Sequence, residues 1–157
     1  KEAKNNFEQS FKILSYVISK QSEYSKTRVE MNDLDTEVLN FKIKLCIAEA
    51  QSLSYFFCLD KNMDIDLQIS ALVKEKEYLE NLQKHLNNER IYRNLNSKEL
   101  SEIIKYYQNL CLGLLYQKLS EKNLSEFKKT GLNYGYTITL LIESENCFQM
   151  NRNLLVR

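Results

Sequence analysis

Residues 69–86 read ISALVKEKEYLENLQKHL, and this stretch predicts a long amphipathic helix. Ile69, Leu72, Leu79 and Leu86 recur at nearly heptad spacing, which places them on one face of a helix. The other positions are mostly lysine, glutamate and glutamine, which suit a solvated surface. Because a helix with one apolar face is stable only when that face is packed, we expect the rest of the chain to supply further helices.

The same spacing of three and four recurs along most of the chain and predicts four more helices. We expect them over residues 3–25, 33–60, 96–119 and 123–142, with polar stretches such as 87–95 between them. The sequence therefore predicts about five long helices.

Two of these helices begin with a capping signal. Asn96 and Asn123 each precede a glutamate by three positions, a pattern that satisfies backbone N–H groups at a helix start. We therefore expect a turn over residues 120–122 that joins two antiparallel helices. Their apolar stripes are Leu100, Ile103, Ile104, Tyr107, Cys111, Leu114 and Leu115 in the first, and Phe127, Gly131, Tyr134, Ile138, Leu141 and Ile142 in the second.

Glycine is rare, and its positions indicate close helix packing. The chain has 3 glycines, which are Gly113, Gly131 and Gly135, and all lie within predicted helices. Glycine costs a helix about 1 kcal/mol relative to alanine, and this cost is tolerable where another helix backbone approaches closely. We expect such an approach at these three positions.

Composition also favours helices and limits the possible partners. The 157 residues include no proline, so the chain lacks the turn residues that a β-sheet protein of this length needs. With 22 basic and 21 acidic residues the formal net charge is +1. Proteins that bind nucleic acids or anionic membranes usually have a marked excess of basic residues, which this chain lacks. The 4 cysteines form no C-x-x-C pair and lie in apolar stretches, which favours a reduced, cytoplasmic protein.

The sequence contains no recognisable set of catalytic or metal-binding residues. The single histidine, His85, has no nucleophile or carboxylate partner at a recognisable spacing, and we interpret it as a solvated surface residue. Aspartate and asparagine alternate over residues 60–66 as in a calcium-binding EF-hand loop. However, Ile65 replaces the invariant glycine and Ala71 replaces the bidentate glutamate. We therefore expect a polar bend between two helices there, and no metal, cofactor or catalytic residue.

Several short stretches, in this order, resemble the BRO domain, the helical module of the ALIX family of endosomal adaptors. The first is IAEAQ at residues 47–51, followed by the aromatic run YFF at 55–57. ISALVK at 69–74 is similar to the stretch that opens the next helical run of the family. The pair formed by SEF at 125–127 and Gly-Leu at 131–132 resembles its last helical hairpin.

This resemblance implies an all-α fold in which long antiparallel helices form a tetratricopeptide-like solenoid. Residues 1–157 would be a single helical domain and a fragment of a larger BRO-like domain. Domains of this family bind the C-terminal amphipathic helix of ESCRT filament subunits in an apolar groove, and act as cytoplasmic adaptors recruited to endosomes. By position, the groove residues here would be Tyr55 or Phe56, followed by Ile69 and Leu72.

Two other interpretations remain open at this point. The chain could be a generic tetratricopeptide-like scaffold that binds another peptide or protein. It could also be part of an all-α enzyme whose catalytic residues lie outside these residues. We expect an adaptor that binds a protein helix, is not an enzyme, and associates with membranes through its partners only.

Overall fold

The computed structural model describes residues 2–24, 36–86, 97–132 and 134–155. These residues form helices and no strand, so the prediction of an all-α fold with about five helices is confirmed. The predicted loop at 87–95 and the predicted cap at Asn96 lie outside the described residues. The helices are α1 (Glu2–Tyr24), α2 (Thr36–Asp60), α3 (Ile65–Leu86), α5 (Ser97–Thr130) and α6 (Tyr134–Leu155).

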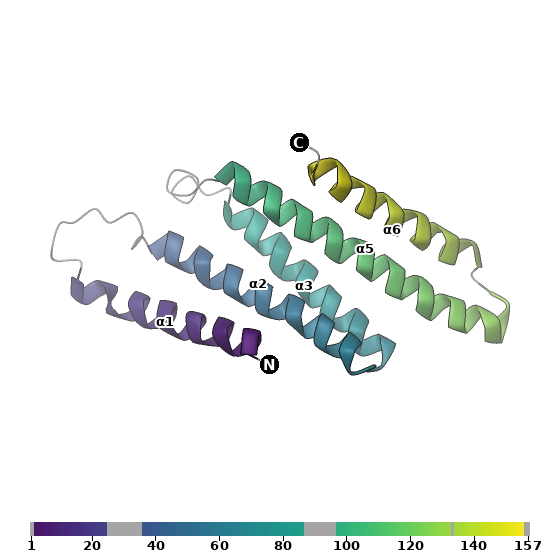
Figure 1. The fold of residues 1–157 in the computed structure, drawn as a ribbon, viewed down its shortest axis with the longest axis horizontal. Helices are drawn as coiled ribbons and strands as arrows, with labels where there is room; N and C mark the ends of the chain where they lie inside the picture. Colours follow the sequence, from purple (N-terminus) through teal and green to yellow (C-terminus); the bar gives the residue numbers. More distant parts are fainter. Residues whose placement is uncertain (1, 25–35, 87–96, 133, 156–157) are drawn as a thin grey trace.

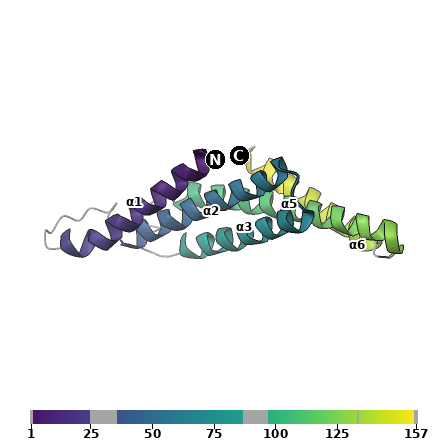
Figure 2. The same cartoon turned by 90° about the horizontal axis from the view of Figure 1, so that it is seen from below.

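Each helix runs antiparallel to the one before it and packs on it (Figure 1). The extensive contacts join α1 to α2, α2 to α3, α3 to α5, and α5 to α6. Seen edge-on, α3 lies below α2 and the first half of α5 (Figure 2). As a result α2 and α5 run in the same direction, both of them packed on α3.

The hydrophobic core fills the space between α2, α3 and α5. Leu72 and Leu82 of α3 have no exposed surface, and Phe41 of α2 and Ile104 of α5 are each 1% exposed. The apolar stripe predicted for 69–86 forms part of this core, because its three leucines are buried and its isoleucine packs against the cluster. The core cluster consists of Phe41, Ala48, Tyr55, Ala71, Leu72, Leu79, Leu82, Leu86, Ile104, Cys111 and Leu115.

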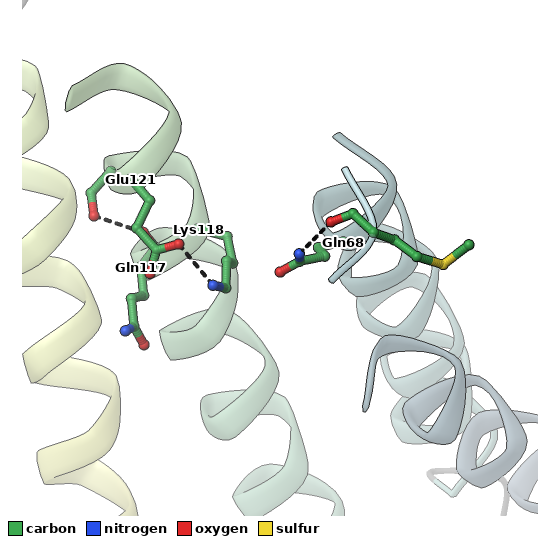
Figure 3. A network of polar contacts seen from close by, with 6 residues as sticks. Gln68, Gln117, Lys118 and Glu121 are labelled. Carbon is green, nitrogen blue, oxygen red and sulfur yellow. Dashed lines mark hydrogen bonds and ion pairs between the residues drawn. The ribbon is translucent and has the colours of Figure 1, made fainter. Parts of the chain in front are cut away.

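The predicted bend between α2 and α3 is confirmed, and its polar residues cap the two helices. Asn62 has a φ of 47° and Met63 N donates to Cys58 O at 2.9 Å, an arrangement that closes a helix C-terminus. Asp64 Oδ1 accepts a 2.8 Å hydrogen bond from Asp66 N at the start of α3. Figure 3 shows the Gln68 amide, which donates to Met63 O at 2.7 Å. These aspartates therefore have a structural role in the turn.

The predicted turn at 120–122 is wrong, because α5 runs without a break from Ser97 to Thr130. Within it the Ser120 hydroxyl donates to Gln117 O at 2.7 Å, so it bonds back into its own helix. Lys118 and Glu121 form an ion pair at 2.7 Å, one turn apart, which also suits a helix interior (Figure 3). The expected helix start at residue 123 therefore lies inside α5.

The helix ends instead at Gly131, which has a φ of 73°. This left-handed conformation favours glycine, and Gly131 N donates to Phe127 O at 2.7 Å, which caps the helix. A Cβ at Gly131 or Gly135 would meet no atom within 4 Å. The expected close approach is therefore wrong at these two glycines.

At Gly113, where α5 and α6 meet, the nearest atoms belong to a side chain of α6 and not to its backbone. A Cβ on Gly113 would lie 2.6 Å from Phe148 Cε1 of α6. The Ser144 hydroxyl of α6 also donates to Gly113 O at 2.8 Å. A larger residue at this position would therefore require the Phe148 ring or the helix to shift.

Candidate functional site

The four predicted groove residues do not form one accessible surface. Leu72 is 0% exposed and Tyr55 is 2% exposed, because both fill the space between α2, α3 and α5. Neither side chain can therefore reach a partner in this structure. Ile69 is half-buried and packs against the same core. Phe56, by contrast, is 51% exposed.

Phe56 lines a groove of about 450 Å³ that we call the α2–α5 groove. Leu79 of α3 contributes to its lining, while α2 and α5 supply the rest. The groove follows from the packing, because α2 and α5 both lie on α3 and leave a channel between them. Its lining residues are Leu45, Ala48, Glu49, Ser52, Leu53, Phe56, Leu79, Leu100, Ile103, Ile104 and Tyr107.

The lining of the groove is mostly apolar and its walls are open to solvent. On the α5 side Ile103 is 50% exposed and Tyr107 is 43% exposed. Together with Phe56 they give a concave surface of large apolar side chains, which in proteins marks a binding site. Ile103 and Tyr107 belong to the apolar stripe that the sequence predicted for this helix, although the sequence did not single them out as a site.

A buried carboxyl group lies under the groove. Ser52 Oγ, in the groove lining, donates to Glu75 Oε1 at 2.6 Å, and Glu75 is 6% exposed. Burial raises the pKa of the Glu75 carboxyl above its ordinary value, and the hydrogen bond from Ser52 partly opposes this shift. The Ser52 hydroxyl that lines the groove is therefore already bonded to a buried carboxyl group.

Cys111, also in this core, is chemically inert. Burial, and secondly the Glu75 carboxylate, raise the pKa of the Cys111 thiol to about 12. Its Sγ donates to Leu72 O at 3.3 Å. Since the thiolate is the nucleophilic form, a thiol with this pKa stays protonated and unreactive near neutral pH.

A second hollow of about 470 Å³ lies beside the groove, between the first turns of α5 and the end of α6. We call it the α5–α6 hollow. Ile103 and Tyr107 line both depressions, so these two side chains form the ridge that separates them. The Tyr106 and Tyr107 rings pack edge to face with centroids 5.7 Å apart. The hollow is lined by Glu99, Glu102, Ile103, Tyr106, Tyr107 and Leu154.

His85 is not the solvated residue that the sequence predicted. It is half-buried, and its Nε2 contacts Lys44 Nζ of α2. His85 thus links α2 to α3. Among the described residues, no group of three or more histidine, cysteine, aspartate or glutamate side chains could hold a metal ion.

Comparison with protein-family models, with characterised proteins and with solved structures found no match. None of the helices, over the residues that the structure describes, is long and apolar enough to cross a membrane. The resemblance to the BRO domain therefore depends on the sequence motifs alone, and the functional argument depends on the groove.

Proposed function

We propose that this chain is a protein-interaction module that binds an amphipathic helix of a partner protein in the α2–α5 groove. The observation that carries the proposal is the row of exposed apolar side chains, Phe56, Ile103 and Tyr107, around a groove with Leu79 in its lining. A helix laid in such a groove buries its apolar residues at i, i+3 or i+4, and i+7 against the two walls.

The dimensions of the groove support this mode of binding. A volume of about 450 Å³ accommodates a few large side chains. In complexes of this kind a few apolar anchors provide most of the binding energy. The walls are two long helices that run in the same direction on α3, so the groove is bounded by rigid elements.

The proposed ligand follows from the sequence resemblance. BRO domains bind the C-terminal helix of ESCRT filament subunits, so we propose this helix as the first ligand to test, with endosomal recruitment as the consequence. The neighbour-to-neighbour packing of the helices is compatible with a tetratricopeptide-like solenoid within a larger BRO-like domain. A generic helical scaffold with another peptide ligand is the alternative.

The test is a fluorescence-anisotropy titration of the whole chain against a labelled peptide of that C-terminal helix. We expect saturable binding that Phe56→Asp or Ile103→Asp weakens by at least about tenfold, or about 1.4 kcal/mol. Phe57→Asp is the matched control, because Phe57 is 48% exposed on the same helix and does not line the groove. Circular dichroism would check that each variant keeps its helices.

Two results would contradict the proposal in different ways. An equal loss of binding in the Phe57→Asp variant would mean that the peptide adheres to apolar surface without using the groove. No binding up to about 1 mM peptide, weaker than about −4 kcal/mol, would exclude this ligand and favour the alternative scaffold.

A further inference from the structure

The charged residues around the α2–α5 groove all have the same sign. Of the described residues that line the groove or the α5–α6 hollow, three are charged, and they are Glu49, Glu99 and Glu102. No lysine or arginine is among these lining residues, although the chain as a whole has 22 basic and 21 acidic residues. The charged residues that line the two depressions are therefore all negative.

These carboxylates lie on both sides of the apolar surface. Glu49 belongs to the α2 wall of the groove, whereas Glu99 and Glu102 line the hollow beyond the ridge formed by Ile103 and Tyr107. No ion pair of the three is present within the described residues. Glu49 is exposed, and partial desolvation raises the pKa of its carboxyl.

Two tyrosine rings accompany the carboxylates of the hollow. Tyr106 and Tyr107 line it together with Glu99 and Glu102. A lysine or arginine side chain is attracted both to carboxylates and to the faces of aromatic rings. The hollow thus has the chemistry of a site for a basic side chain that reaches over the ridge.

We propose that the partner helix is basic, with lysine or arginine on both edges of its apolar face. This inference rests on the proposed function and specifies its ligand. One edge of the helix faces Glu49, and the other faces the α5–α6 hollow. The apolar residues supply most of the affinity, while the charges select the ligand and its orientation.

The same charges argue against helix α6 of a second copy of this chain as the occupant. Within the described residues, α6 presents the exposed apolar side chains Ile138, Leu141 and Ile142. However, Glu145 lies two turns after Ile138 and thus on the same face, where it is exposed. Docking α6 into the groove would bring like charges together.

The experiment compares two synthetic 18-residue helical peptides with the same leucine positions. One has lysine on both edges of the leucine face, and the other has glutamate. We expect the lysine peptide to bind the whole chain at least about tenfold more tightly at low salt, and 0.5 M NaCl to reduce this difference because it screens exposed charges.

Charge reversal in the protein provides the matched comparison. Glu49→Lys with Glu102→Lys should reverse the preference between the two peptides. Glu77→Lys with Glu126→Lys changes the net charge equally at exposed positions outside both depressions, and it should leave the preference in place.

Several outcomes would overturn the inference. They are equal binding of the two peptides, binding of neither, or an equal effect of the two double variants. The Phe56→Asp variant distinguishes failure of the charge selection from failure of helix binding in the groove. If Phe56→Asp abolishes binding of both peptides while they bind the original chain equally, the groove is a helix site without charge selection. If Phe56→Asp has no effect, the groove itself is not the site.

Discussion

Helices α3 and α6 each have 22 residues and apolar side chains at helical spacing, yet they bury different kinds of residue. In α3 the leucine stripe lies in the core, and Leu72 is 0% exposed. In α6 the apolar residues Ile138, Leu141 and Ile142 are between 41% and 55% exposed. The buried residues of α6 are Thr137, Leu140, Ser144, Cys147 and Asn151, and the Phe148 ring also lies against α5 at Gly113.

The difference follows from how many neighbours each helix has. Helix α3 packs extensively on α2 and on α5, so its apolar stripe is enclosed. Of the described helices, α5 is the one that packs extensively on α6. Most of the buried residues on that face of α6 are small or polar, and Asn151 Nδ2 donates to Tyr106 O at 3.0 Å. Apolar periodicity therefore identifies a helix face, but it does not identify whether another helix packs on that face.

The largest effect should separate the two helices directly. We expect Leu72→Ala in α3 to lower the free energy of unfolding by about 2–5 kcal/mol, because it leaves a cavity in the core. Leu141→Ala in α6 removes the same atoms from a side chain that is 49% exposed, and it should cost less than about 0.5 kcal/mol. Urea denaturation followed by circular dichroism measures both.

Equal costs at these two positions would mean that α6 is covered in solution by something that the described residues do not include. The aspartate variant of Leu72 extends the test. We expect it to lose helical content, since a buried carboxylate there has no partner. Retention of the fold by Leu72→Asp would contradict the burial of this side chain.

The second effect concerns the close contact between α5 and α6. Gly113→Ala adds a Cβ that would lie 2.6 Å from the Phe148 ring, so the ring or the helix must shift. In a Phe148→Ala background the same change should stabilise α5 by up to about 1 kcal/mol through helix propensity. We expect the two substitutions to couple by about 1–3 kcal/mol in a double-mutant cycle. Additive effects would show that Phe148 avoids the added methyl group without cost.

The sequence predicted those parts of the fold that depend on local patterns. It placed the bend at 60–66 because polar and turn-forming residues interrupt two apolar stripes there. It misplaced the later turn, because asparagine followed by glutamate three positions on also occurs on the exposed surface of a continuous helix. The left-handed Gly131, which ends α5, was interpreted as a packing glycine.

The candidate site was predictable only in part, for a related reason. Phe56 was among the predicted residues and lies in the groove, whereas Leu72 and Tyr55 lie in the core. All three have apolar side chains at helical spacing, so periodicity alone cannot distinguish them. Their exposure depends on α2 and α5 lying side by side on α3, which is a tertiary arrangement of segments far apart in the sequence.

A third, smaller effect tests the polar contact of α6. Ser144 is 5% exposed and donates to Gly113 O at 2.8 Å. We expect Ser144→Ala to lower the free energy of unfolding by about 0.5–1.5 kcal/mol, the net value of one hydrogen bond. Thr139→Ala is the matched control, because the exposed Thr139 hydroxyl bonds only to its own helix, at Gly135 O. An equal cost for both would mean that the interhelical bond adds nothing.

The smallest effect should come from Glu75, a buried acidic residue of α3, and it depends on pH. The pKa of Glu75 is raised above 4.5 by burial, so folding favours the protonated form. The resulting stability is fully present below pH 4.5 and is lost as the pH rises through the folded-state pKa. Glu75→Gln keeps the shape and can still accept the Ser52 hydrogen bond, but it cannot become charged.

We therefore expect Glu75→Gln to raise the urea midpoint at pH 7.5 and to leave it almost unchanged at pH 4. Glu77 lies two residues further along α3 and is exposed, so Glu77→Gln should change neither midpoint. The effect is small because the Ser52 hydroxyl, 2.6 Å from Oε1, already compensates part of the desolvation of the carboxylate. A lower midpoint for Glu75→Gln at pH 7.5 would mean that the charged Glu75 carboxylate stabilises the α2–α3–α5 core. Glu75 would then contribute to packing in α3, as the buried polar residues of α6 do in theirs.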